Sequence, residues 1–163
     1  GASRNLVLYR ASNFPFEWER HRVLIEDREL ADPTLLEQDG RLWLFAAERD
    51  GAGSAADMMS VFYADGLHEP WRPHPANPVS IDRAGARPGG NIIRSGGRLL
   101  LPVQDCTETY GGALGLSEIV RITETEIEVA EATPIRPDGD WPYPRIHTLN
   151  RAGRLEVIDG IVP

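Results

Sequence analysis

The stretch Thr34-Leu35-Leu36-Glu37-Gln38-Asp39-Gly40-Arg41-Leu42-Trp43-Leu44-Phe45 places a turn sequence between two apolar segments. The triplet Gly-Arg-Leu returns at 97–99 and at 153–155, at spacings of 57 and 56 residues, and again lies between apolar segments. Two apolar segments that flank a short turn containing glycine are typical of a β-hairpin. The sequence therefore predicts three β-hairpins at a regular spacing.

A second repeated pattern fills the chain between these hairpins. Residues 9–18 and 63–71 each indicate the end of one strand, a turn and the start of another. A repeat unit of about four strands in roughly fifty residues is typical of a β-propeller blade. Only 54–59 and 117–123 could form short helices, and the second segment fits better as a strand.

We therefore expect an all-β chain of four-stranded antiparallel blades, amounting to about three blades of a propeller. The expected parts of a domain at 4–163 are a half blade at 5–26, a blade at 32–81, a blade at 88–135 and a half blade at 146–161. Residues 1–3 are interpreted as a cloning remnant. Since a closed propeller needs about four blades, the missing blades come either from further sequence or from a second copy of the chain.

Composition excludes several classes of function. The net charge of −8 disfavours nucleic acid as a partner. No apolar run is long enough to span a membrane, no signal peptide is visible, and the single Cys106 fits a reducing compartment, so we expect a cytoplasmic protein. Neither a zinc-ligand spacing nor a nucleotide-binding glycine motif occurs, so we expect no metal and no cofactor.

The hairpins also predict where polar side chains gather. The start of the first strand and the end of the second strand of a hairpin lie at the same edge of the sheet. In a propeller, the innermost strands gather around the central channel, so one mouth of that channel should carry Asp32, Arg87 and His147, backed by Glu48, Gln104 and Asp105. Tyr110 and Trp141 are available nearby to stack on a sugar ring. Groups of this mixture suit a sugar or a sugar phosphate.

Residues 31–45 resemble a strand hairpin in the five-bladed propellers of glycoside hydrolase family 43. Nearly the whole chain also resembles the propeller domain at the N-terminus of plant glucosamine inositol phosphorylceramide transferases. That domain occurs too in bacterial proteins, some of them fused to formyltransferase-like domains. The segments that carry this second resemblance are 86–90, 104–106, 110–114 and 158–160. The resemblance implies five blades in the complete propeller.

The resemblance also implies roles for residues at the predicted mouth. Asp32 matches the aspartate that tunes the pKa of the catalytic acid in the hydrolases, and His147 matches a histidine common at a later blade. Arg87 stands where the hydrolases have their general-acid glutamate, and the general base belongs to a blade that this chain lacks. Because an arginine does not donate a proton at neutral pH, the hydrolase machinery is expected to be incomplete. Arg87 would instead suit a phosphate or a carboxylate.

Three functions stay open at this point. The first is sugar recognition in the service of a glycosyl- or formyltransferase. The second is an active glycosidase or glycan phosphorylase that uses Asp32 with Glu48 or Asp105. The third is a non-catalytic scaffold that binds proteins. Independently of these functions, Asp32 and Arg87 could simply brace the fold, and Trp18 and Trp71 are expected to pack between blades.

Overall fold

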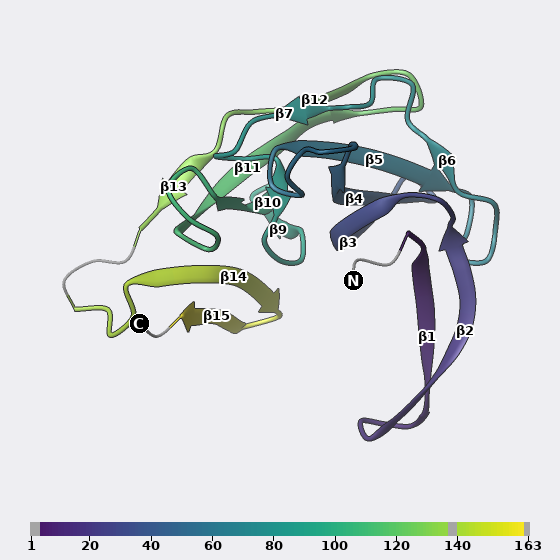
Figure 1. Cartoon of the computed structure of the whole chain (residues 1–163), viewed down its shortest axis with the longest axis horizontal. Coiled ribbons are helices and arrows are strands. Elements are labelled where there is room, and N and C mark those ends of the chain that lie inside the picture. The colour runs from purple at the N-terminus through teal and green to yellow at the C-terminus, as the bar shows by residue number, and fades with distance from the viewer. Residues whose placement is uncertain (1–3, 137–139, 162–163) are drawn as a thin grey trace.

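The computed structural model describes residues 4–136 and 140–161, and every regular element in these residues is a β-strand (Figure 1). All strand pairs are antiparallel. The described part of the chain contains no helix that could span a membrane. The expected all-β class is confirmed, while residues 1–3, interpreted above as a remnant, and residues 162–163 lie outside the described residues.

The strands form four sheets that follow one another along the chain. The first is the hairpin of β1 (Leu6–Asn13) and β2 (Glu17–Ile25). The second contains β3 (Glu29–Gln38), β4 (Arg41–Arg49), β5 (Met58–Ala64), β6 (Arg72–Pro73) and β7 (Ser80–Ile81). The third contains β8 (Arg87–Pro88), β9 (Ile93–Ser95), β10 (Arg98–Asp105), β11 (Ala113–Ile122), β12 (Ile127–Val129) and β13 (Thr133–Ile135). The fourth is the hairpin of β14 (Arg145–Ala152) and β15 (Leu155–Ile161).

The four sheets curve around an open arc, with the two terminal hairpins at its ends (Figure 1). This arrangement is compatible with part of a β-propeller. The segment 117–123, which could have been a helix, lies almost entirely in strand β11, and 54–59 is a turn that leads into β5.

The three predicted Gly-Arg-Leu hairpins are confirmed. They join β3 to β4, β9 to β10 and β14 to β15, with two residues in each turn. In the first turn Asp39 and Gly40 have φ angles of 52° and 73°. Two successive residues with positive φ make the type I′ turn, whose twist matches that of the strands it joins.

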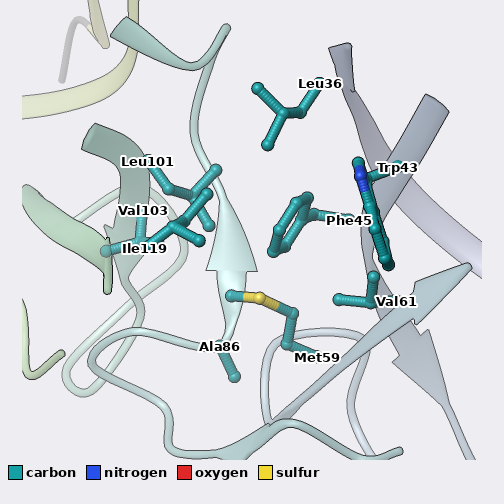
Figure 2. Packing of buried hydrophobic residues seen from close by; sticks show 9 residues of the cluster. All are labelled: Leu36, Trp43, Phe45, Met59, Val61, Ala86, Leu101, Val103 and Ile119. Atoms are coloured by element: carbon teal, nitrogen blue, oxygen red, sulfur yellow. The ribbon is translucent and has the colours of Figure 1, made fainter. Parts of the chain in front are cut away.

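A separate apolar cluster fills each junction between neighbouring sheets. Ile25 and Phe62 belong to the cluster between the first two sheets, and Ile93 and Ile146 belong to the cluster between the last two. The middle junction holds the largest cluster (Figure 2), formed by Leu36, Trp43, Phe45, Met59, Val61, Ala86, Leu101, Val103 and Ile119. The sheets are therefore held together pairwise, each by its own core.

Strand β4 shows why the sequence gives this packing. Its side chains alternate between two faces, so Trp43 and Phe45 enter the middle cluster while Leu44 and Ala46 enter the cluster toward the first hairpin. A strand covered on both faces needs a continuous apolar run, which 42–47 supplies. Truncation of the fully buried Phe45 to alanine should cost about 3–5 kcal/mol of unfolding free energy.

Three smaller predictions concern single side chains. Trp71 packs beside Leu24 at the junction of the first two sheets, as expected. Trp18, on the N-terminal hairpin, is 54% exposed and lies edge-on to Phe14, so its packing between blades stays a prediction. Cys106 is buried, as expected for a small apolar side chain.

Candidate functional site

Three strands from successive sheets bring polar side chains to one mouth of the arc. Asp32 belongs to β3, Arg87 to β8 and His147 to β14, and each lies at the end of its strand that is remote from the Gly-Arg-Leu turn. The pairing of β3 with β4 shifts register between Ala31 and Thr34, and Asp32 has a φ of 50°. Few residues other than glycine adopt such a φ, so the bulge turns Asp32 out of the ladder at a cost in backbone strain.

The carboxylate of Asp32 is the centre of one half of this mouth. Its Oδ2 accepts a hydrogen bond from Arg87 Nε at 2.6 Å and another from Gln104 Nε2 at 2.8 Å. Gln104 Nε2 also donates to the carbonyl oxygen of Pro88 at 2.8 Å. Gln104 is completely buried, yet its Oε1 has no hydrogen-bond partner among the described residues. A buried acceptor of this kind is costly unless a ligand or water uses it.

The other half of the mouth contains three side chains joined in series by hydrogen bonds. A hydrogen bond joins the Tyr110 hydroxyl to Nε2 of His147, and a second joins Nδ1 of His147 to Oδ2 of Asp159 over 3.1 Å. Arg87 connects the two halves, because its guanidinium carbon lies 4.8 Å from the centroid of the Tyr110 ring. This distance is within the range of a cation–π interaction.

The surroundings shift two pKa values in this second half. Burial raises the pKa of the Tyr110 hydroxyl, and the positive charge of Arg87 opposes that rise only in part. Burial also opposes ionisation of Asp159, but hydrogen bonds from Thr148 and His147 outweigh it and hold the pKa of that carboxyl below its ordinary value of 3.8. At neutral pH Tyr110 therefore keeps its proton and Asp159 is a carboxylate.

A hollow of about 390 Å³ lies beside the Asp32 half of the mouth. Its walls come from β3, β10, β14 and the segment around β8, and consist of Asp32, Pro33, Thr34, Leu35, Pro88, Gly89, Gly90, Asn91, Gln104, Thr148 and Asn150. Three polar atoms on its lining residues have no protein partner among the described residues: Oδ1 of Asp32, Oε1 of Gln104 and Nδ2 of Asn150. Two acceptors and one donor suit a ligand that carries several hydroxyl groups, since a hydroxyl can both donate and accept.

Gly90 allows the wall of this hollow to form. Its φ is 146°, and a Cβ at this position would lie 1.8 Å from the carbonyl oxygen of Leu149 in β14. The adjacent Gly89 accepts a backbone hydrogen bond from Leu149 N–H at 2.8 Å. Only a residue without a side chain lets the two backbones approach this closely.

Five of the predicted site residues lie together in the mouth. Asp32, Arg87, Gln104, Tyr110 and His147 are joined by the contacts described above. The common location of Asp32, Arg87, Gln104 and His147 follows from the predicted hairpin geometry, whereas a loop brings Tyr110 to them. The role of all five toward a ligand stays a prediction.

Glu48 and Asp105 do not join this group, which corrects the expectation that they back the mouth. Asp105 follows Gln104 directly in β10, so the two side chains point to opposite faces of the sheet. Its carboxylate binds Thr107 and, at 3.2 Å, Arg136. These contacts overcome the effect of burial and lower its pKa. Glu48 is almost fully buried and its carboxylate pairs with Arg28 at 2.7 Å, at a different hollow.

The sequence prediction of the site includes Trp141, which does not line the hollow, and omits residues that do. Trp141 was expected to stack on a ligand, but it contacts Tyr143 and does not line the hollow beside Asp32. Gly90, Asn91 and Asn150 do line it. The pair Gly89-Gly90 after a strand start was the available signal, because adjacent glycines indicate close approach of another backbone.

The side chains of the mouth offer several kinds of interaction. Among residues 4–136 and 140–161, no three His, Cys, Asp or Glu side chains are arranged to hold a metal ion. The groups present can bind hydroxyls through Asp32 and Gln104, hold a negative charge near Arg87, and move a proton between Tyr110 and His147.

Comparison with known proteins identifies the relatives of this chain. Glucosamine inositolphosphorylceramide transferase 1 from rice (Oryza sativa subsp. japonica) is 39% identical over 127 residues, which cover 76% of this chain and 17% of the relative. The Arabidopsis thaliana protein of the same name is 32% identical over 129 residues, covering 77% of this chain and 17% of the relative. Both relatives are plant proteins, and the chain matches less than a fifth of their length. No solved structure matches. Since the family model for the N-terminal region of glucosamine inositolphosphorylceramide transferase 1 matches residues 1–153, the chain belongs to that family.

Proposed function

We propose that this chain is a carbohydrate-recognition domain that serves a sugar-transferring enzyme. The family supports the second part of the proposal, because the relatives are named as transferases and their name includes a sugar, glucosamine. The relatives are much longer than the matched region, which leaves room in them for a separate catalytic domain.

The observation that carries the recognition role is the hollow beside Asp32. Free acceptor atoms on Asp32 and Gln104 lie on a wall that also holds the Asn150 amide. Sugar hydroxyls would donate to the two acceptors and accept from the amide. Satisfying the buried Oε1 of Gln104 would add binding free energy, since that atom has no partner in the described part of the chain.

We further propose that the fold is part of a five-bladed propeller related to glycoside hydrolases, with Arg87 in place of their general acid. The separation of the carboxylates supports recognition over hydrolysis. Asp32 forms an ion pair with Arg87, while Glu48 pairs with Arg28 and Asp105 with Arg136, away from the mouth. A glycosidase normally needs two carboxylates on opposite sides of one scissile bond.

A binding experiment tests the proposal with a matched pair of variants. The probes are glucosamine, myo-inositol and glucose 1-phosphate, titrated by calorimetry or by NMR shift mapping. Asp32→Asn removes the charge in the hollow, and Asp39→Asn makes the same change at a hairpin turn. Asp32 and Asp39 have φ angles of 50° and 52°, so backbone strain changes equally in both variants.

We expect wild type and Asp39→Asn to bind a probe equally, and Asp32→Asn to bind it about tenfold more weakly, a change of about 1.4 kcal/mol. Stronger binding of glucose 1-phosphate than of the neutral probes would assign a phosphate-binding role to Arg87. No binding of any probe at high concentration would refute the recognition role.

A further inference from the structure

The three side chains in the second half of the mouth come from three different elements. Tyr110 belongs to the loop between β10 and β11, His147 to β14 and Asp159 to β15. They nonetheless form one continuous path from hydroxyl to imidazole to carboxylate. The loop between β10 and β11 therefore carries Tyr110 to the β14–β15 hairpin, which provides His147 and Asp159.

The hydrogen bonds favour one arrangement of the protons. Thr148 donates to Asp159 Oδ1 from both its backbone N–H and its hydroxyl, so the carboxylate is oriented and ionised. An ionised carboxylate can only accept, so Nδ1 of His147 carries the proton of that hydrogen bond, and in the neutral imidazole the lone pair of Nε2 then faces the Tyr110 hydroxyl. The same relation of carboxylate, imidazole and hydroxyl activates serine in acyl-transfer enzymes.

Tyr110 has the two further properties that a reacting group needs. It is 48% exposed, so a solute can reach it. Arg87 lies over its ring and favours the negative charge that develops on the phenol oxygen during attack. Because burial raises the pKa of Tyr110, its proton must pass to His147 for the oxygen to react.

We propose that Tyr110 is a nucleophile toward acyl groups, activated by His147 and Asp159, and that the substrate class is an activated or sugar-borne ester. The Tyr110 oxygen bonds to the ester carbonyl carbon while the phenol proton moves to Nε2 of His147. The ester C–O bond then breaks, and the leaving oxygen takes that proton from His147. The products are acylated Tyr110 and a free alcohol. This reactivity does not depend on sugar binding in the hollow beside Asp32.

The chain contains its own comparison residues. Tyr9 is 55% exposed and Tyr143 is 37% exposed, so they bracket the exposure of Tyr110. All 17 basic residues are arginine, so no lysine amine competes for an acylating reagent. Differences in acylation among the three tyrosines therefore report activation rather than access.

The experiment is acetylation of the folded chain by 4-nitrophenyl acetate, with each site quantified by peptide mass spectrometry. We expect Tyr110 to be acetylated at least about tenfold faster than Tyr9 or Tyr143. His147→Gln should slow the reaction at Tyr110 by about 100-fold, the lower end of what a general base contributes. His68→Gln, whose ring contacts only His21 among the described rings, is the matched control and should leave the rate unchanged.

A second measurement separates activation from damage to the fold. Long-range ¹H–¹⁵N spectra should show the Nδ1–H tautomer of His147 in the wild type, and Asp159→Asn should lose that tautomer and the fast acetylation together. Circular dichroism must match the wild type for each variant. Acetylation of Tyr110 at the rate of Tyr9, or a fast rate that survives in a folded His147→Gln variant, would overturn the proposal.

Discussion

The two halves of the mouth differ in their exposure to solvent. In the first half Gln104 is fully buried and the Arg87 side chain is only 14% exposed, while in the second half Asp159 and Tyr110 are 47% and 48% exposed. The first half joins three strands of two packed sheets, and the second joins a loop to a terminal hairpin. Loss of a contact should therefore cost stability in the first half and reactivity in the second.

Among changes in the mouth, the largest effect on stability is expected at the wall of the first half. Gly90→Ala puts a Cβ 1.8 Å from the Leu149 carbonyl oxygen, so β14 must move away from β8 and β9. We expect a loss of at least about 3 kcal/mol of unfolding free energy, measured by urea denaturation. Gly96→Ala is the control: its φ is also positive at 58°, but a Cβ there has open space. This variant should lose only about 1 kcal/mol. Equal losses in both would contradict the proposed close approach.

The next effect is loss of the ion pair at the centre of the first half. Arg87→Met leaves the Asp32 carboxylate with Gln104 as its remaining donor, so we expect a loss of about 2 kcal/mol in the same assay. Asp32→Asn combined with Arg87→Met should recover part of this loss, because the unpaired charge is gone. A double variant that is no better than the sum of the two singles would show that the pair does not couple.

A smaller loss of stability is expected as the pH falls into the acidic range. The pKa values of Asp159 and Asp105 are both lower in the folded chain than the ordinary 3.8. Their stabilisation is therefore complete above the unfolded pKa of about 3.9 and is lost as pH falls through the lower folded values. We expect Asp159→Asn to flatten the fall of the melting temperature between about pH 5 and pH 2. An unchanged acid profile in this variant and in Asp105→Asn would contradict the assignment.

The smallest effect on stability belongs to the second half. Tyr110→Phe removes the hydroxyl of a half-exposed side chain and keeps the ring under Arg87, so the free energy of unfolding should change by no more than about 0.5 kcal/mol. The same variant should show no acetylation at position 110. If its stability fell as far as that of Arg87→Met, the two halves would not differ as described.

The sequence predicts the hairpins and the meeting of Asp32, Arg87 and His147, because both follow from antiparallel pairing around a repeated turn. Side-chain direction at the strand ends was harder to predict. Gln104 and Asp105 are neighbours, and only the strand register decides which of them faces the mouth. The bulge at Asp32 also changes which side chains face inward after it.

Contacts made by loops could not be predicted from repeats at all. The hydrogen bond of Tyr110 to His147 depends on the path of the loop before β11, and no periodicity reports that path. The role of Gly90 depends on an atom of Leu149, far along the chain. Such contacts follow from packing between sheets, which a single sequence does not encode in a local pattern.

The Gly-Arg-Leu turns at 40–42, 97–99 and 153–155 lie at the opposite ends of the strands from the mouth. A side chain added at Gly40, Gly97 or Gly153 would meet nothing within 4 Å. Lengthening of these turns at their tips would therefore leave the side chains of the mouth in place, provided that Arg41 and Arg94 keep the contacts that tie the flanks of the first turn to the third sheet. Over evolutionary time, one face of this domain can therefore acquire insertions without a change in the side chains of the other face.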